Sequence, residues 1–308
     1  MNRTHALSCS ILASGLLAAS ALAQTYVPLP FEDNFSNGVQ PDSDSVTNFW
    51  NSFSVGSQGS VQEADGNWVI TAGPHGSSTG SPLTGSPAVS VMSRTTGEEK
   101  YFNLFDADAG LQVRGVGMEF VPGEGPATGT VRNASAVRAR FGFGALGLST
   151  YQASDSLAVV LYGDGRVQAG VKINGGVSDP ETAAATKALD FYLPAPATGF
   201  DFRFDDPQDG AYSHFTLTLY YGENQSYQTN VAVKTAFSAS DWGAGDGKAW
   251  LIVGAQRSNA TDPQDSVRVT IGSVAVTPIL TPGLYLIGYS EPQRLDVKAA
   301  IRPKTELN

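Results

Sequence analysis

The fold of this chain is decided by residues 212–277, which begin Tyr212-Ser213-His214-Phe215-Thr216-Leu217-Thr218-Leu219-Tyr220-Tyr221 and end near Asp265-Ser266-Val267-Arg268-Val269-Thr270-Ile271. Both runs alternate apolar and polar side chains with a period of two, which indicates strands with one face in a core. Between them lie a Gly/Asp/Trp-rich bend at 241–247 and the apolar run Trp250-Leu251-Ile252-Val253. The stretch therefore predicts the closing strands of a large antiparallel sandwich.

The same alternation extends toward the N-terminus. Further alternating segments lie at residues 137–143, 167–173 and 200–204, and residues 31–35, 68–71 and 157–162 are also predicted to be strands. In the segment 137–143, Arg138 and Arg140 share the face opposite to the apolar side chains. Gly163-Asp164-Gly165 joins two of the segments and is typical of a hairpin, because these residues tolerate positive φ.

Two local features depart from plain strands. The alternation of residues 111–120 slips at Arg114-Gly115, which predicts a β-bulge. Asp179-Pro180-Glu181, followed by residues 182–189, predicts one short helix with Asp179 as its N-cap. With 34 glycines and 16% charged residues, the composition otherwise suits an all-β protein with many turns.

The first 23 residues have the features of a secretory signal peptide. Arg3 provides a positive charge, residues 11–22 are apolar but too short to span a bilayer, and Ala21-Leu22-Ala23 is a small-x-small cleavage site. We expect a signal peptide at 1–23, a sandwich domain at 24–277 and a tail at 278–308, with one extra strand at 284–287 and no regular structure over 291–308. The predicted location is extracellular or periplasmic, and no later segment is long and apolar enough to cross a membrane.

Charge and cysteine content exclude several classes of partner and chemistry. The chain carries 19 Lys+Arg against 29 Asp+Glu, a formal net charge of −10. This acidic balance argues against nucleic acid and anionic membranes as partners. The single cysteine, Cys9, lies inside the predicted signal peptide, so the mature chain has no disulfide and no thiol chemistry.

Several motifs together resemble one known superfamily. They are Phe31-Glu32-Asp33-Asn34-Phe35, Phe49-Trp50, Asp65-Gly66-Asn67-Trp68-Val69-Ile70, the hairpin at 161–167 and Asp265-Ser266-Val267-Arg268-Val269. Over residues 30–277 they look like the concanavalin-A-like lectin/glucanase jelly roll, with the laminin-G-like secreted bacterial domains as the nearest relatives. The resemblance implies an all-β, two-sheet antiparallel jelly-roll sandwich. It leaves function open, because sugar binders, glycoside hydrolases, polysaccharide lyases and structural modules share this fold.

No catalytic set of the sandwich enzymes is complete in this sequence. The glucanases of this class carry Glu-x-Asp-x-x-Glu on one strand, and the nearest match, Glu63-Ala64-Asp65-Gly66-Asn67-Trp68, lacks the last Glu. Gly66 indicates a turn, so Glu63 and Asp65 are interpreted as hairpin residues. The alginate-lyase motifs Arg-x-Glu-x-Arg and Gln-x-His are absent. We therefore assign no catalytic residue.

Three residues are predicted to bind a ligand. Sugar binding needs an exposed ring beside amides or carboxylates, and Trp242, flanked by Asp241, is the candidate ring. His214 lies at a strand start and shares a polar face with Thr216 and Thr218. It suits either a general base or an ordinary polar sheet face.

The resemblance also implies a metal. In many jelly-roll carbohydrate modules a structural Ca²⁺ ties the opening strand to the closing one, and Asp33 and Asp265 occupy the matching places here. Carboxylate oxygens suit this hard cation, although an aspartate in a turn is the alternative interpretation of both residues.

Three hypotheses about function follow. The first is a secreted, non-catalytic protein that binds a polysaccharide or cell-surface glycan, or acts in adhesion. The second is a glycoside hydrolase or polysaccharide lyase whose site does not match known motifs. The third is a structural component of the envelope or matrix.

Overall fold

The computed structural model of the chain describes residues 26–39, 42–55, 59–73, 88–95, 98–103, 109–121, 137–145, 155–172, 187–205, 213–233, 247–257, 266–278, 285–291 and 294–300, together with Ser240, Trp242 and Gly245. Every named element in these ranges is a β-strand. The described residues contain no helical segment that could span a bilayer.

One layer of the fold is built from two antiparallel sheets joined end to end. The six-stranded sheet has the order β1 (Phe31–Asp33), β20 (Ser273–Pro278), β9 (Ala109–Arg114), β15 (Ala197–Asp205), β16 (Ser213–Tyr221) and β17 (Gln225–Val233). The four-stranded sheet has the order β10 (Gly117–Val121), β19 (Ser266–Ile271), β4 (Asn67–Ala72) and β3 (Gly59–Ala64). The chain passes directly from β9 to β10 and from β19 to β20, so the two sheets form one layer.

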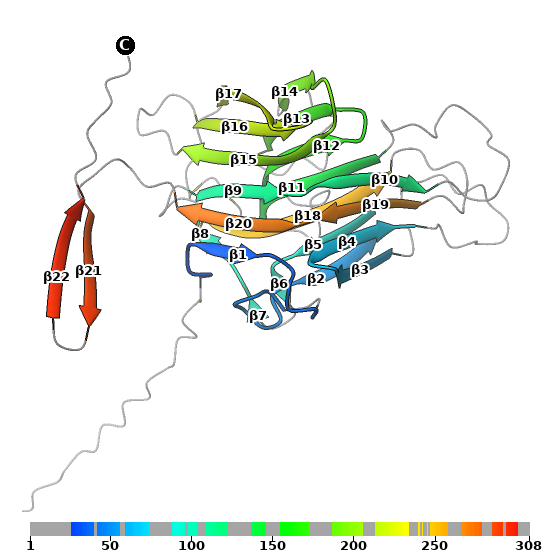
Figure 1. The fold of residues 1–308 in the computed structure, drawn as a ribbon. Coiled ribbons are helices and arrows are strands. Elements are labelled where there is room, and N and C mark those ends of the chain that lie inside the picture. The colour runs from blue at the N-terminus through cyan, green and yellow to red at the C-terminus, as the bar shows by residue number, and fades with distance from the viewer. Residues whose placement is uncertain are drawn as a thin grey trace, which may run out of the picture.

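The other layer is an eight-stranded antiparallel sheet. Its order is β14 (Lys187–Tyr192), β13 (Arg166–Lys172), β12 (Asp155–Tyr162), β11 (Val137–Ala145), β18 (Lys248–Arg257), β5 (Ala88–Met92) and β2 (Asn51–Val55), with β8 (Phe102–Asn103) also paired to β18. A short pair, β6 (Arg94–Thr95) and β7 (Glu98–Glu99), stands apart from it. Figure 1 shows the two layers face to face.

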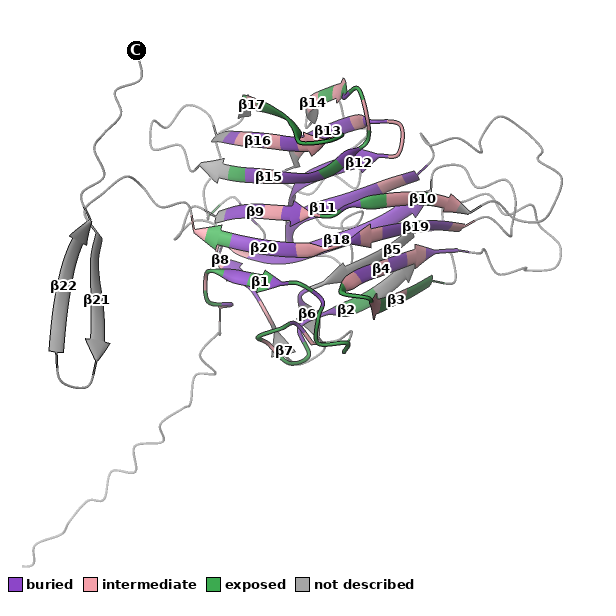
Figure 2. Cartoon of the chain, viewed as in Figure 1, coloured by how far each residue is buried: buried purple, intermediate pink, exposed green. Residues whose placement is uncertain are grey.

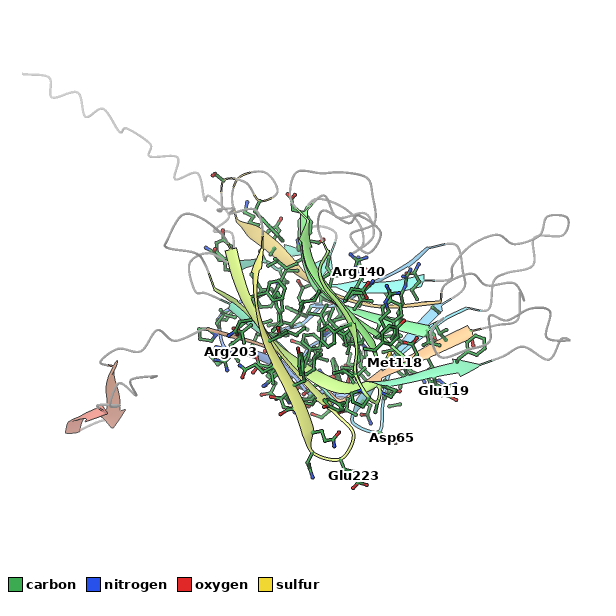
Figure 3. The ribbon with its side chains drawn as sticks, turned by 90° about the horizontal axis from the view of Figure 1, so that it is seen from above. Asp65, Met118, Glu119, Arg140, Arg203 and Glu223 are labelled. Carbon is green, nitrogen blue, oxygen red and sulfur yellow. The ribbon has the colours of Figure 1, made fainter. Side chains whose placement is uncertain are left out.

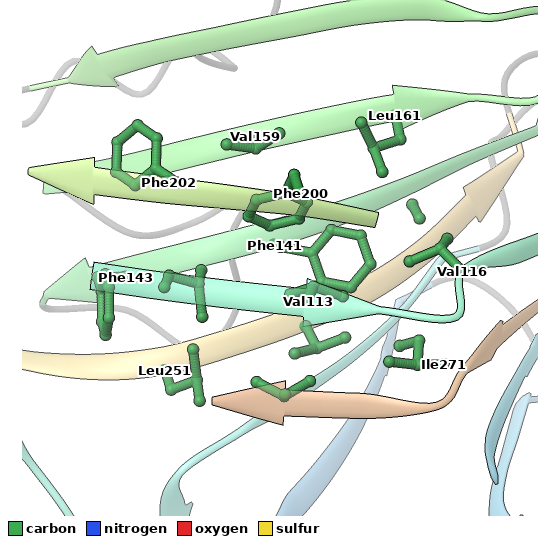
Figure 4. Close-up of a cluster of buried hydrophobic side chains, with 14 of the residues drawn as sticks. Val113, Val116, Phe141, Phe143, Val159, Leu161, Phe200, Phe202, Leu251 and Ile271 are labelled. Atoms are coloured by element: carbon green, nitrogen blue, oxygen red, sulfur yellow. The ribbon is translucent and has the colours of Figure 1, made fainter. Parts of the chain in front are cut away.

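The core lies between the layers because each strand buries one of its two faces. Phe200 of β15 packs against Phe141 of β11 across the two layers, with ring centroids 5.3 Å apart (Figure 4). At the N-terminal end, six buried aromatic side chains pack together: Phe31, Phe35, Phe49, Trp50, Trp68 and Phe102. Figure 2 shows buried residues along the central strands of both layers. The prediction of an all-β, two-sheet antiparallel jelly-roll sandwich is confirmed.

The opening strand of the chain lies beside a closing strand, but that closing strand is β20 and not the segment 265–271. Strand β1 pairs with β20, where Asp33 lies opposite Val274, whereas β19 pairs with β4 and β10. At Arg114-Gly115, where the alternation of apolar and polar residues changes phase, β9 ends and the chain continues into β10. There Gly115 has φ +65°, and a Cβ on it would lie 3.1 Å from the Gly272 backbone.

Two sequence predictions of secondary structure differ from the fold. The C-terminal residues of the predicted helix, 187–189, belong to β14, which pairs with β13, and the rest of that helix lies outside the described residues. Sheet pairing outweighs a local helix signal where a partner strand is present. In the tail, β21 (Tyr285–Glu291) and β22 (Arg294–Ala300) form a two-stranded sheet, where one strand and an irregular segment were predicted.

Candidate functional site

The candidate site lies on the face of the eight-stranded sheet that points away from the core. On β11, Arg138 and Arg140 alternate with the core residues Ala139 and Phe141, as their spacing predicts. In Figure 3, Arg140 and Arg203, which belongs to the other layer, lie on different sides of the packed core side chains. We call this surface the outer face of the eight-stranded sheet.

Antiparallel register brings polar residues from five strands together on the outer face. Arg138 lies opposite both Tyr162 and Gln256, Gln168 lies opposite Asp190, and Arg166 lies opposite Tyr192. Residues directly opposite each other in a sheet share a face. We call the following set the outer row: Gln256 of β18, Arg138 of β11, Tyr162 of β12, Arg166 and Gln168 of β13, and Asp190 and Tyr192 of β14.

Hydrogen bonds connect the first part of the outer row. Arg138 Nε donates to Gln256 Oε1 at 2.7 Å, and Arg138 Nη1 lies 3.5 Å from the Tyr162 hydroxyl. That hydroxyl donates in turn to Gln168 Oε1 at 2.8 Å. Tyr162, Gln168 and Gln256 are only 5%, 4% and 8% exposed. A buried, hydrogen-bonded set of this kind holds its donors and acceptors in fixed positions.

An ion pair continues the row toward the sheet edge. Arg166 Nε and Nη2 each donate to one oxygen of Asp190 at 2.8 Å, and these two side chains are 32% and 29% exposed. The hydrogen bonds and charge of Asp190 raise the pKa of Arg166, so this guanidinium stays charged. The guanidinium carbon of Arg166 is 5.4 Å from the centre of the Tyr162 ring, which links the pair to the buried part of the row.

The accessible end of the row is aromatic. Tyr192, on the edge strand β14, is 64% exposed, and among the described residues it is the most exposed large hydrophobic side chain. The outer row therefore runs from buried amides to a ring that solvent reaches. At the accessible end, the Arg166–Asp190 pair and the Tyr192 ring can present polar groups and a flat apolar surface to the same ligand.

Gly142 shows how closely the strands below the row approach each other. A Cβ at this position would lie 1.8 Å from the carbonyl oxygen of Leu157 on β12. Side chains other than hydrogen are therefore excluded at Gly142 unless the two strands separate. The register of the same two strands places Arg138 opposite Tyr162.

The predicted ligand-binding residues do not come together in the structure. Trp242 was expected to be an exposed ring, and this expectation is wrong: it is 0% exposed and lies in the main core. Its Nε1 donates to the Lys248 carbonyl oxygen at 2.9 Å, which allows the indole to be buried with its polar atom satisfied. Asp241 lies outside the described residues.

His214 belongs to the other layer. It is the second residue of β16, in register with Ala232 of β17 and Asp205 of β15. Its backbone is therefore in the six-stranded sheet, whereas the outer row is on the eight-stranded sheet, and its side chain lies outside the described part. A role for His214 in ligand binding stays a prediction.

Asp33, one of the two predicted calcium ligands, is buried and hydrogen-bonded to protein donors. It is 0% exposed, its Oδ1 accepts from the Phe35 backbone N–H at 3.0 Å, and its Oδ2 accepts from Trp50 Nε1 at 2.6 Å. Each oxygen thus accepts one hydrogen bond from a protein donor, and a role for Asp33 as a calcium ligand stays a prediction. Asp265 lies outside the described residues, so the calcium prediction is untested there.

Burial makes Asp33 a weaker acid. Desolvation raises its pKa from 3.8 to about 6, against the lowering effect of the hydrogen bonds from Trp50 and Phe35, and the nearby carboxylates of Asp44 and Glu63 raise it further. The pKa of Glu63 is also raised by burial, while the Gly38 N–H donates to its Oε2 at 2.8 Å. Within the described ranges, no group of three or more His, Cys, Asp or Glu side chains is arranged to hold a metal ion.

The interpretation of Glu63 and Asp65 as hairpin residues is confirmed. They end β3 and begin the turn into β4, where Asp65 and Gly66 both have positive φ, +53° and +68°. Two consecutive positive φ angles are what a two-residue hairpin turn requires.

The sequence predicted which face of the sheet Arg138 occupies, but it did not predict which residues of other strands lie beside it. The alternation of 137–143 places Arg138 and Arg140 on one face. Nothing local connects Arg138 to Gln256, which follows 118 residues later. Strand order and register bring them together, and neither can be read from period alone.

Comparison with known proteins found similar solved structures at low sequence identity. No known protein family and no curated protein matches the sequence. Among similar solved structures, the carbohydrate recognition domain of Emp47p has a TM-score of 0.42 and 15% identity, covering 76% of this chain and 90% of that one. The winged bean acidic lectin complexed with methyl-α-D-galactose has a TM-score of 0.44 and 11% identity, covering 80% of this chain and 98% of the lectin.

A similar enzyme structure is the marine PL-14 alginate lyase from Aplysia kurodai. Its TM-score is 0.41 at 9% identity, and the match covers 75% of this chain and 92% of the lyase. All three are concanavalin-A-like jelly rolls, the fold that the sequence motifs resemble. Similarity at this level concerns the fold and says nothing about the ligand of this chain.

Proposed function

We propose that this chain is a secreted, non-catalytic carbohydrate-binding protein whose glycan lies along the outer row. The observation that supports this proposal best is the continuity of the row, from the hydrogen-bonded Arg138, Tyr162 and Gln168 to the exposed ring of Tyr192. Sugars offer hydroxyl groups on their edges and C–H groups on their faces, so a sugar site combines fixed polar groups with an aromatic ring.

The energetics of the row favour binding without large rearrangement. Its side chains are already hydrogen-bonded to one another, so binding a ligand would immobilise few additional side chains. At the accessible end, the Arg166–Asp190 pair offers charged donors and acceptors beside Tyr192. Charge-assisted hydrogen bonds of this type are stronger than neutral ones and suit sugar hydroxyls.

Glycan binding is tested with the full chain on an array of plant, algal and bacterial polysaccharides, followed by calorimetry on any that bind. We expect Tyr192→Ala to weaken binding by about tenfold, because stacking on the ring is lost while the exposed position leaves the fold intact. Tyr220→Ala is the matched control, since Tyr220 stacks against Arg114 on the six-stranded sheet. No binding to any glycan, or equal losses in both variants, would contradict the proposal.

Tyr162 makes a polysaccharide lyase the second candidate. Its hydroxyl lies between the Arg138 guanidinium and the Gln168 amide, an arrangement in which a phenol could exchange a proton with a substrate. A glycoside hydrolase is less well supported, because such enzymes use two carboxylates. The outer row contains one carboxylate, that of Asp190, and both its oxygens accept from Arg166.

A simple assay distinguishes glycan binding from polysaccharide lyase activity. A lyase acting on a uronate polysaccharide forms an unsaturated product that absorbs ultraviolet light. The binding proposal expects no such product from the full chain. Formation of the product, abolished by Tyr162→Phe and kept by Tyr192→Phe, would replace binding with catalysis as the function of the outer row.

A further inference from the structure

Strand β14, at the edge of the eight-stranded sheet, carries an aromatic ring on each of its two faces. Tyr192 lies on the outer face, opposite Arg166, and is 64% exposed. Phe191, its neighbour in the chain, lies on the opposite face of the strand, because successive side chains of a strand alternate. Phe191 is half-buried and packs against the main core. No described strand pairs with the other side of β14, so the backbone groups on that side form its free edge.

The other layer contributes a further ring at the same place. Tyr227 of β17 packs on Phe191, with ring centroids 5.3 Å apart and 54° between the ring planes. Since β17 is the last strand of the six-stranded sheet, the edges of the two layers meet at this pair, and Figure 1 shows β14 and β17 next to each other. Tyr227 is nevertheless 45% exposed. Two of the three exposed large hydrophobic side chains among the described residues, Tyr192 and Tyr227, therefore lie on either side of β14.

Polar groups without charge surround the Tyr227 ring. Gln225 lies two residues before it on the same face of β17 and is exposed. The whole of β17 contains no charged residue. We call Phe191, Gln225 and Tyr227 the seam. Rings accept the C–H faces of sugars, while amides and free backbone groups accept their hydroxyls, so the chemistry of the seam suits a neutral sugar.

We propose that the seam is a second subsite for the glycan of the outer row, and that one chain passes from Tyr192 around the free edge of β14 to Tyr227. This inference rests on the proposed function, because it extends the path of the same ligand. Phe191 and Tyr192 lie on opposite faces of one strand, so a chain that contacts both Tyr192 and Tyr227 has to turn around that strand. The ligand is therefore a neutral polysaccharide with a curved backbone. A straight ribbon reaches one of the two rings at a time.

The dimensions of the sandwich require a long ligand. From β18 to β14 the outer row crosses four spacings between neighbouring strands, which is about 19 Å. The step from one layer to the other adds about 10 Å. A single sugar is much shorter than this path and contacts one ring, whereas the interior of a long chain contacts both. Two contacts on one chain strengthen binding, because the second ring is held close to a chain that the first has bound.

The test is calorimetry of the full chain with three series of glucose-based oligosaccharides. Maltodextrins and laminarin oligosaccharides have curved backbones, and cellodextrins have straight ones. We expect Tyr227→Ala to weaken the binding of long curved chains by about tenfold, because one stacking contact is lost. The same variant should bind the disaccharides and all cellodextrins at the Tyr192 end like the wild type. Long curved chains should bind the wild type with one chain per protein molecule.

Two further variants separate the ring from the fold. Tyr227→Phe keeps the ring and should bind long curved chains like the wild type. Tyr220→Ala is the matched control, because it removes a tyrosine ring that lies under the Arg114 guanidinium on the same six-stranded sheet. It should also bind them like the wild type. Retained disaccharide binding by Tyr227→Ala shows that the outer row of that variant is intact.

Several results overturn the inference. One is that long curved chains bind Tyr227→Ala as tightly as the wild type. Another is that Tyr227→Ala loses affinity for disaccharides or cellodextrins to the same extent, because Tyr227 would then only support the fold. Failure of both curved series to bind the wild type overturns it as well. The array of polysaccharides and Tyr192→Ala test the proposed function separately: binding to straight chains alone would leave that function standing, and binding to no glycan would end both.

Discussion

The carboxylate of Asp33 accepts a 2.6 Å hydrogen bond from the indole Nε1 of Trp50, and both residues are buried. The second carboxylate oxygen accepts from the Phe35 backbone N–H. Asp33 thereby joins the first strand to the aromatic cluster at the N-terminal end of the core. Trp50 and Phe35 each pack on Trp68 of β4, so the contact extends into the other part of the same layer.

Asp33→Asn is expected to lower the free energy of unfolding by about 1–3 kcal/mol at a pH near 5, because an amide has one acceptor where two N–H donors converge. The measurement is denaturant unfolding followed by tryptophan fluorescence. Asp44→Asn is the control, since Asp44 is exposed and its contacts with Asn34 and Ser36 lie at the surface. Equal losses of unfolding free energy in the two variants would show that the buried contact of Asp33 contributes no more than the surface contacts of Asp44.

The stability contribution of Asp33 should depend on pH in a defined direction. Its pKa rises from 3.8 to about 6 on folding, so its contribution is complete below pH 3.8 and is lost as the pH rises through 6. The difference in unfolding free energy between wild type and Asp33→Asn should therefore shrink between pH 4 and pH 7.5, by at most about 3 kcal/mol. A difference that stays constant, or grows, over this range would contradict the raised pKa.

Gly142→Ala is expected to destabilise the sandwich by about 3 kcal/mol, because its methyl group would overlap the Leu157 carbonyl oxygen and push β11 from β12. Thermal unfolding of both this variant and Gly117→Ala gives the test. At Gly117 a new Cβ would meet the Thr270 side chain at 3.8 Å, an ordinary contact, so the change in stability there should be small. Similar behaviour of the two variants would argue against close approach of β11 and β12.

Tyr162→Phe should affect stability and binding together. The change removes the hydroxyl that joins Arg138 to Gln168 and leaves the half-buried Arg138 and the buried Gln168 with one partner fewer, at a cost of about 1 kcal/mol in unfolding free energy. If the outer row binds the glycan, affinity should fall as well. Tyr192→Phe keeps the stacking ring and should retain both stability and affinity. A Tyr162→Phe variant with lower stability and unchanged affinity would make the network structural only.

Local patterns in the sequence determined the strands and their turns. Alternation with a period of two places Phe141 in the core and Arg138 outside it, whatever the strand order, because successive side chains of a strand point to opposite faces. The hairpin at Asp65-Gly66 was equally local, since positive φ is a property of those residues. The prediction of the sandwich rested on these short-range signals.

Tertiary structure alone decided where the functional groups meet. Trp242 looked exposed because Gly and Asp surround it in sequence, yet the Lys248 carbonyl satisfies its indole and allows burial. The sequence did not show that the Trp50 indole donates to the Asp33 carboxylate, because the two residues are 17 positions apart. The outer row depends on the register of five strands spread over more than a hundred residues, and register is set by the packing of the whole core. Side-chain alternation specifies the face of a residue, and only the assembled sheet specifies its neighbours.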